Sequence, residues 1–423
     1  MDGRTPVVVV TGWSDATAKT ARSLLRAGTV VVEHDLGDVH RGVVRRTVTS
    51  VDGERTSTLD LAHCCVSCTL RDDLLPLLRR LSARSTVDRI VLALDRILEP
   101  EAVCAAIADV VVSGVIGQVD GPAARDVRVA AVVGCIDAAT WLDDATGDDA
   151  LDDRGIVTGV DDERTVAQVV VGQVSMCDAV VVSGSTSDGW EHARLHAVLA
   201  RLAPGAPVAY APTAYSPSSV EKLLAAVPAG ARRGASSDPH DGLLCGQPPL
   251  DGDAGVTIVE FAAERPFHPV RLHDAIDVLL DGVVTARGRV WVATQPNEVL
   301  WLESAGGGLR VGKVGNWLAA MTVAEQEQVS AERRAMAASR WHERFGDRHT
   351  SLVVLVHAAD PTDIDRALQW ALVTDDELAN ESAWATWPDP FGEEHRDPCG
   401  EPQQSLCGDS ESPLTQSHRE DQA

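Results

Sequence analysis

The chain has 423 residues, enough for two or three domains, and 44% of them are hydrophobic, so most of the chain is expected to be globular. Its 63 acidic and 37 basic side chains leave a net charge of −26, which argues against binding free DNA, because so acidic a chain repels phosphate backbones. No apolar run approaches the roughly 20 residues needed to cross a bilayer. We therefore expect a cytoplasmic protein with no membrane partner.

The first half of the chain alternates short apolar runs with helical patterns. A β-branched run at residues 5–11 is followed by Gly12 and a helical stretch at 16–27, the order that opens a nucleotide-binding βαβ unit. Because the strands are short and apolar throughout, the pattern predicts an α/β domain with a parallel sheet covered on both faces. Further strands are expected at residues 29–33, 87–94, 127–135 and 179–183, and further helices at 69–81, 102–113 and 164–174.

Changes in composition divide the chain into four regions. Residues 1–202 form the α/β domain, and residues 203–252, rich in Pro, Gly and Ser, are expected to be a linker region with one short helix near 220–227. Residues 253–380 predict a smaller α+β domain with a mostly antiparallel sheet, and residues 381–423 have the acidic, polar composition of a disordered tail. In the α+β domain, strands are expected at 256–262, 283–294, 298–304 and 351–356, and helices at 269–280, 323–340 and 361–374.

Three of the nine cysteines lie close together in the segment from His63 to Cys68. Cys65 and Cys68 have the C-x-x-C spacing with which two thiolates reach one tetrahedral zinc ion, and His63 and Cys64 are further candidate ligands. In a cytosolic chain such a cluster favours metal or redox chemistry over disulfides. A zinc site, a redox pair near a helix N-terminus and a set of inert buried thiols all fit the segment.

The turn between the first strand and the first helix lies where a phosphate-binding loop belongs and ends in a Lys-Thr pair. The pattern G-x-x-x-x-G-K-[ST], however, requires glycine where this chain has Trp13 and Ala18. A carboxylate in the loop would also repel phosphates, so a plain strand-to-helix turn is the alternative. The candidate nucleotide-binding residues of the loop are Gly12, Asp15, Thr17, Lys19 and Thr20.

Several motifs together resemble the CobW-type (CobW/HypB/UreG) family of P-loop GTPases, which includes metal chaperones. The cysteine segment with Thr69-Leu70-Arg71 resembles the family's Gly-Cys-x-Cys-Cys-Thr-[Leu/Val]-Arg motif. The resemblance extends to about residue 380 and implies a P-loop-type parallel sheet domain followed by a smaller α+β CobW C-terminal domain. The segments similar to that C-terminal domain are residues 265–272, 282–291, 345–348 and 374–377.

The residues with which this family binds nucleotides are replaced in the first loop. When the family's loop is aligned on Gly12, its two inner glycines become Asp15 and Thr17. Its phosphate-binding lysine becomes Ala18, although Lys19 is one place away. The alignment therefore implies a loop that has lost close backbone approach to phosphates.

Two further nucleotide motifs of the family are also replaced. The acidic strand end falls on residues 93–100, where the glutamate is lost and Asp95 is a partial substitute. The guanine-reading N-K-x-D falls on residues 183–186, which lack its carboxylate. Because three motifs fail together, the resemblance implies little or no GTP hydrolysis and argues against GTP with magnesium as a working cofactor.

One actinobacterial branch of the family, the ribosome hibernation factor-recruiting proteins, is especially similar to this chain. The similar segments are residues 65–75, 266–269, 306–308, 389–392 and 397–399. This resemblance implies a zinc-responsive adaptor that recruits a ribosome hibernation factor to the small ribosomal subunit under zinc limitation. The alternative is a GTP-dependent zinc metallochaperone, and GTP hydrolysis by the purified protein distinguishes the two.

Three other features each have a functional and an ordinary interpretation. His395 and Cys399 are either a second metal pair or an incidental one, and Trp384 and Trp387 either dock a partner or belong to a core. A group of arginines near the cysteines is either a basic face for RNA or an acidic partner, or ordinary paired surface. Its members are Arg41, Arg45, Arg46, Arg71, Arg79, Arg80 and Arg84.

Overall fold

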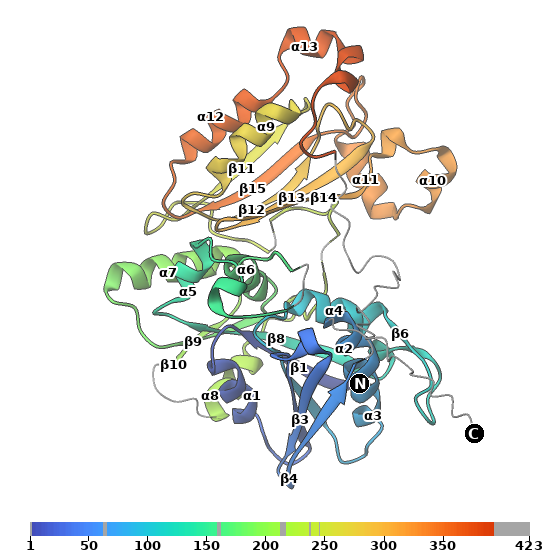
Figure 1. Ribbon diagram of the computed structural model, residues 1–423, viewed down its shortest axis with the longest axis vertical. Coiled ribbons are helices and arrows are strands. Elements are labelled where there is room, and N and C mark those ends of the chain that lie inside the picture. The colour runs from blue at the N-terminus through green and yellow to red at the C-terminus, as the bar shows by residue number, and fades with distance from the viewer. Residues whose placement is uncertain are drawn as a thin grey trace, which may run out of the picture.

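The computed structural model describes residues 2–61, 66–158, 162–211, 217–236, 238–244 and 246–392, which form two stacked domains (Figure 1). The first contains an eight-stranded sheet in the order β10-β9-β8-β1-β5-β2-β3-β4, and the second a five-stranded sheet in the order β11-β15-β12-β13-β14. The predicted fold class, a parallel-rich α/β domain followed by an α+β domain, is confirmed. Among the described residues, no helix is long and apolar enough to cross a membrane.

Apolar β-branched residues form the centre of the first sheet. From β10 to β2 the neighbouring strands pair in parallel, and the valines of β1 are buried on both faces. At the far edge β3 and β4 form an antiparallel hairpin, which the sequence pattern does not predict because more than half of its residues are Thr, Arg or Ser. The strands are β1 (Thr5–Gly12), β2 (Thr29–Asp35), β3 (Val43–Ser50), β4 (Gly53–Asp60), β5 (Arg89–Ala93), β8 (Val127–Asp137), β9 (Ala179–Ser183) and β10 (Val208–Ala211).

Helices cover both faces of this sheet, as predicted (Figure 1). One face is covered by α1 (Ala16–Ser23) and α8 (Pro217–Ala225), whose Ala21 and Leu223 are buried against valines of the strands. Sheet formation leaves the alternate valines on the opposite face, where further helices bury them. These helices are α3 (Leu75–Ser82), α4 (Pro100–Asp109), α6 (Val166–Ser175) and α7 (Gly189–Leu202), with the short α5 (Trp141–Thr146) beside α6.

Residues 203–252 are not a linker throughout, which corrects the prediction from composition. β10 extends the first sheet by pairing in parallel with β9, and α8 packs against α1 and β10. The helix expected near 220–227 corresponds to α8. The Pro- and Gly-rich flanks hide this strand because it is only four residues long and depends on its neighbour for its hydrogen bonds.

The helix predicted at residues 69–81 begins earlier and is interrupted. It starts as α2 (Val66–Thr69), passes through a π-helical turn (Leu70–Leu74) and continues as α3. Pro76 has no backbone N–H to continue the α-helical pattern, and the π turn lies directly before it. Asp73 lies in this π turn, where its carboxylate contacts His34 and Arg46.

The second domain is an antiparallel sheet with helices on one face. α9 (Pro269–Ala275) and α12 (Pro361–Ala371) bury Leu272 and Leu368 in a core with the sheet. The helical stretch expected at residues 323–340 divides into α10 (Val323–Gln328) and α11 (Ala331–Ser339). The strands are β11 (Thr257–Ala263), β12 (Val283–Val290), β13 (Glu298–Ala305), β14 (Gly308–Asn316) and β15 (Thr350–Val356).

The first part of the predicted disordered tail is folded. After α13 (Asp375–Ala379), Trp384 is buried in a core that includes Trp291 and Trp317. Trp387 stacks on His268 with ring centroids 4.4 Å apart. The prediction of disorder over residues 381–423 is therefore wrong for 381–392, because tryptophans among the acids supply the apolar area that composition averages hide. The burial of Trp384 also places this residue in the core rather than on a docking surface.

The two domains meet where the turn between β13 and β14 contacts the end of α5 and the start of α6. The backbone N–H of Gly307 donates to the carbonyl oxygen of Gly147 at 2.9 Å. Gly306 has φ +49°, and a Cβ on it would collide with the same carbonyl oxygen. A Cβ on Gly308 would lie 2.5 Å from the Thr165 hydroxyl oxygen. Three consecutive glycines thus allow backbone-to-backbone contact between the domains.

We expect Gly306→Ala to weaken this contact and to lower the free energy of unfolding by about 2 kcal/mol, because it adds a left-handed alanine and a clash. Urea unfolding and limited proteolysis measure the effect. Gly312→Ala is the matched control in β14, since its Cβ would meet nothing within 4 Å. Equal stability of the two variants would contradict the role of the glycine turn.

Candidate functional site

The candidate residues of the first domain gather at the carboxyl edge of its parallel strands. β1 ends at Gly12, β2 at Asp35 and β5 at Ala93, just before Asp95. Parallel strands that pair in register end at one edge, and ligands of open α/β sheets bind beside it. The first loop, the acidic strand end and the helix that follows the cysteines are therefore neighbours in space.

The first loop is closed on itself. Ser14 accepts the Ala16 N–H on its hydroxyl at 3.3 Å and the Thr17 N–H on its carbonyl at 3.1 Å. The Thr17 hydroxyl is buried and lies 2.8 Å from the position that a Cβ on Gly12 would take. In a phosphate-binding loop, amides at these positions face the phosphates. Here Ser14 accepts two of those amides, and the Thr17 hydroxyl lies beside Gly12.

The remaining predicted nucleotide residues do not face the loop together. Lys19 is exposed, and one step along α1 turns a side chain by about 100° from the direction of Ala18. Thr20 points the other way, because its buried hydroxyl accepts a hydrogen bond from the Cys135 thiol at 3.3 Å. Asp15 is exposed before the first helical residue and caps no backbone amide with its side chain.

The two other predicted nucleotide positions are also engaged within the protein. Asp95 accepts the Leu36 and Ile97 backbone N–H groups at 2.9 and 3.1 Å, and burial raises the pKa of its carboxyl. After β9 the Ser183 hydroxyl donates to a backbone carbonyl, and Asp188 caps α7 by accepting two of its amides. The described residues therefore do not fit GTP with magnesium.

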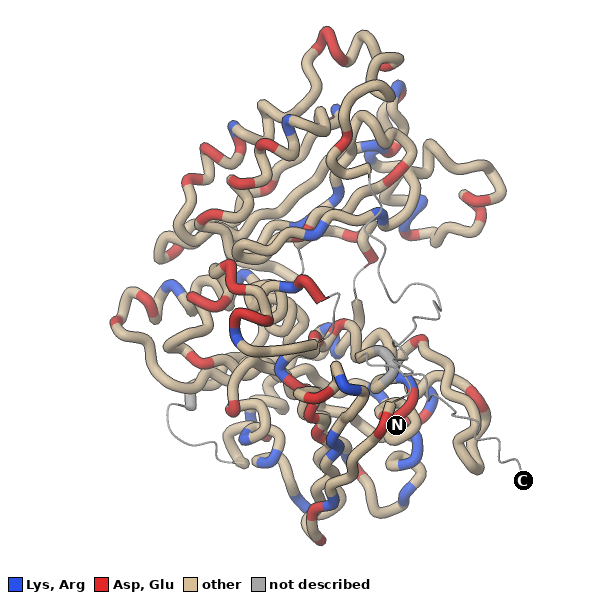
Figure 2. The backbone as a smooth tube through the Cα atoms, in the orientation of Figure 1, with Lys and Arg blue, Asp and Glu red and all other residues tan. Residues whose placement is uncertain are grey.

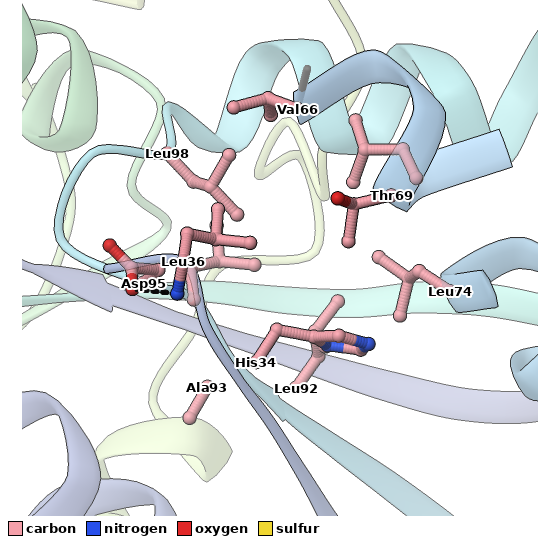
Figure 3. Close-up of a pocket in the computed structure, with 11 residues that line it drawn as sticks. His34, Leu36, Val66, Thr69, Leu74, Leu92, Ala93, Asp95 and Leu98 are labelled. Atoms are coloured by element: carbon pink, nitrogen blue, oxygen red, sulfur yellow. Dashed lines mark hydrogen bonds between the residues drawn. The ribbon is translucent and has the colours of Figure 1, made fainter. Parts of the chain in front are cut away.

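A small apolar pocket lies under α2, between this helix and the ends of β2 and β5 (Figure 3). Its volume is about 10 Å³, room for about one water molecule. The buried Thr69 hydroxyl has no hydrogen-bond partner among the described residues. The pocket is too small for a nucleotide, and it shows how closely the cysteine helix packs on the sheet edge. Its apolar lining includes Leu36, Val66, Leu70, Leu74, Leu92 and Leu98.

A buried ionic group ties that helix to the sheet. The Asp73 carboxylate lies 2.8 Å from His34 Nε2 and forms an ion pair with Arg46, so it joins the π turn to β2 and β3. His34 and Asp73 are each 7% exposed. Sequence reasoning missed this group, because a continuous helix would give Asp73 a different direction, and its only signal is an acid inside an apolar helical run.

The predicted metal ligands lie at the edge of the described chain. His63, Cys64 and Cys65 fall outside the described residues, and Cys68 lies within α2, not on a loop before the helix, with its side chain not described. Among the described residues, no group of three or more His, Cys, Asp or Glu side chains could hold a metal ion. The second candidate pair, His395 and Cys399, also lies outside the described residues.

The described cysteines away from this segment are chemically inert. Cys104, Cys135 and Cys177 are free and buried. Burial raises the pKa of the Cys104 and Cys135 thiols to about 12 and that of Cys177 well above its usual value. A thiol must lose its proton to bind zinc, so these three do not compete with the cysteines of the 63–68 segment.

The predicted basic face is smaller than the sequence indicates. Arg79 is 2% exposed, where it pairs with Asp126 at 2.6 Å and donates to three backbone carbonyls. Arg71, Arg80 and Arg84 are exposed, with no ion pair among the described residues. The other three are paired: Arg41 with Asp38, Arg45 with Asp35 and Arg46 with Asp73.

Comparison with known proteins identifies both domains. The model of the CobW/HypB/UreG nucleotide-binding domain matches residues 26–209, and that of the cobalamin synthesis protein cobW C-terminal domain matches residues 256–372. The first match begins after the loop in which the glycines are replaced. The curated zinc chaperone of Mycobacterium tuberculosis is 50% identical over 398 residues, 93% of this chain and 94% of that protein.

More distant similarity is found to two named GTPases. Zinc-regulated GTPase metalloprotein activator 1 of Dictyostelium discoideum is 24% identical over 345 residues, 79% of this chain and 70% of that protein. The solved Zn(II)-bound YjiA GTPase from E. coli is 15% identical, with a TM-score of 0.35, covering 88% of this chain and 99% of that one. The domain matches and the 50% identical relative show that the chain belongs to the family that joins a CobW/HypB/UreG nucleotide-binding domain to a CobW C-terminal domain.

Proposed function

We propose that this protein is a zinc chaperone that carries one zinc ion on the segment from His63 to Cys68 and passes it to a client protein without hydrolysing GTP. The observation that carries the proposal is a difference between two groups of cysteines. The described cysteines elsewhere in the chain are buried, with raised thiol pKa values, whereas the 63–68 segment holds the C-x-x-C pair. The 50% identical relative, named a zinc chaperone, supports it.

The predicted ligand set of the segment suits exchange of a metal ion better than permanent storage. The helix that follows the cysteines is anchored from below by Leu70 and Leu74 and by the Asp73 ion pair. The C-x-x-C pair supplies two ligands, and His63 or Cys64 a third. The fourth position is left to water or to a group of the client, and an open position allows transfer.

We expect the purified chain to bind one zinc ion and Cys65→Ser/Cys68→Ser to bind none, because serine does not replace a thiolate ligand. Metal analysis after gel filtration gives the stoichiometry. Affinity falls as the pH is lowered, because the thiolates take up protons. Cys104→Ala is the matched control and retains zinc, since its thiol is buried and protonated. Full zinc occupancy in the double variant would place the site elsewhere, with His395 and Cys399 the next candidates.

The closed first loop predicts that the chain neither binds nor hydrolyses GTP at a measurable rate. The variant Asp15→Gly, Thr17→Gly, Ala18→Lys, Lys19→Thr restores the family's loop and should gain binding of a fluorescent GTP analogue, because it reopens the amides to phosphate. Lys19→Ala alone should change nothing, since Lys19 faces solvent. GTP turnover by the unmodified chain with magnesium and zinc would favour the GTP-dependent metallochaperone instead.

We infer a second function, recruitment of a ribosome hibernation factor to the small ribosomal subunit under zinc limitation. It rests on the resemblance of the sequence to that branch of the family and on one structural observation. Arg71 and Arg80 lie exposed on the helix after the cysteines, and Arg84 lies exposed just beyond its end, all without an ion pair among the described residues. In a chain of net charge −26 they are three positive charges close in sequence to the segment proposed to carry zinc.

Sedimentation with purified small ribosomal subunits tests this second function. We expect the chain and a hibernation factor to co-sediment with the subunits when zinc is removed by a chelator. The variant with Arg71, Arg80 and Arg84 changed to Gln should sediment free, because phosphate contacts depend on these charges. No association of the unmodified chain in either zinc state would eliminate the adaptor function and leave the zinc chaperone unaffected.

A further inference from the structure

We propose that the second domain contains a binding site for hydrogen phosphate, in a cavity between β12, the end of β14 and α11. The cavity is lined by three arginines, two histidines and one tryptophan, and it lies beside α11, whose place in the second domain Figure 1 shows. It is separate from the cysteine segment and from the first loop, which both belong to the first domain. Its polar lining residues are Arg289, Arg333, Arg340, His240, His349 and Trp317, with Asp347 as the single acid.

Unpaired buried polar atoms mark this cavity. Trp317 is 1% exposed and its indole N–H has no acceptor among the described residues, and Arg289, 3% exposed, has an unpaired Nε–H. Arg333 Nε, His240 Nε2 and His349 Nε2 are unpaired as well. A buried polar atom without a partner costs about 1–3 kcal/mol, so five such atoms, donors and acceptors, on residues that line one cavity favour a ligand there.

The three guanidinium groups form no ion pair with a carboxylate among the described residues. Arg289 donates only to the Pro239 and Asp241 carbonyl oxygens, and Arg333 only to the Asn316 carbonyl oxygen, so neither meets a carboxylate. The Arg340 side chain has no hydrogen bond among the described residues. Figure 2 shows basic segments gathered where α11 meets the sheet, whereas α12 and α13 carry mostly acidic residues. Three unneutralised guanidinium groups favour an anion.

The acids near the cavity are already engaged or lie outside it. Both oxygens of Asp347 accept backbone N–H groups, from Leu318 and Ala319, at 2.9 Å. Asp238 and Asp241 attract the arginines from the neighbouring loop, but both are exposed and neither lines the cavity. The lining itself therefore carries three positive groups against one negative group.

The histidines decide which anion fits. His349 Nδ1 lies 2.8 Å from the Asp347 carbonyl oxygen, which can only accept, so Nδ1 carries the proton and Nε2 is left as an unpartnered acceptor on a residue that lines the cavity. Burial, Arg289 and Arg340 hold the pKa of His349 at about 4, and burial, Arg333 and Arg289 hold that of His240 at about 4, against the opposing pull of Asp238 and Asp347. Both rings are therefore neutral at pH 7.

Hydrogen phosphate matches this combination of donors and acceptors. Its charged oxygens accept from the guanidinium groups and the Trp317 indole, and its P–OH donates to His349 Nε2. Sulfate offers no such hydrogen at neutral pH. The cavity volume of about 30 Å³ suits a small tetrahedral ion at a mouth bordered by exposed Met336 and Arg340 and leaves no room for a nucleoside.

Titration calorimetry and thermal unfolding of the full chain test the site, with inorganic phosphate as the probe and chloride at matched ionic strength as the reference. We expect phosphate to bind and to raise Tm, and Arg340→Gln to weaken binding roughly tenfold by removing a charge-assisted contact. Arg334→Gln is the matched control, because it removes the same charge from α11 outside the cavity lining and should stay within about twofold.

Each remaining outcome decides the proposal. Absence of a phosphate effect beyond that of chloride, or equal losses in Arg340→Gln and Arg334→Gln, would overturn the site. Sulfate binding as tightly as phosphate would overturn the role of the P–OH and His349. Tighter binding of glycerol phosphate would assign the cavity to the phosphoryl group of a larger ligand instead. Cys65→Ser/Cys68→Ser should bind phosphate like the unmodified chain, which separates this test from that of the zinc chaperone.

Discussion

The parallel pairing of β1 with both β5 and β8 is the constraint on which the first domain depends. It brings the backbone of Gly12 so close to the carbonyl oxygen of Cys135 that a side chain at Gly12 would collide with it. Glycine is therefore required at this position whether or not a phosphate binds. Asp15 and Thr17 stand in the same turn as Gly12 and the sheet is intact with them, so the sheet does not require glycine at these two positions.

The same sheet edge explains how a nucleotide scaffold can become a platform for the cysteine helix. Asp95 accepts two backbone amides and holds the loops after β2 and β5. Asp73 joins the π turn to β2 and β3. Both carboxylates stabilise the sheet edge beside the segment proposed to carry zinc.

Buried arginines in the two domains have different surroundings. Arg79 in the first domain pairs with Asp126 and donates to three backbone carbonyl oxygens. Arg289 in the second domain has an unpartnered Nε–H, as the buried Arg89 and Arg201 of the first domain also have. What distinguishes Arg289 is the cavity that it lines together with two further arginines, two histidines and Trp317.

The sequence predicts the parallel sheet and the order of its main strands and helices, because short β-branched runs alternating with helical patterns allow few other arrangements. It also predicts that a second, α+β domain follows the first. The C-x-x-C pair and the replaced loop glycines are patterns of spacing along the chain, and the zinc site inferred from the pair stays a prediction. The β3–β4 hairpin, β10 and the folded residues 381–392 were not, because each is polar or short and gains its stability from neighbours distant in sequence. The contacts of Asp73 and the arginine cavity of the second domain likewise exist only after folding, since they join residues from separate elements whose directions no local pattern specifies.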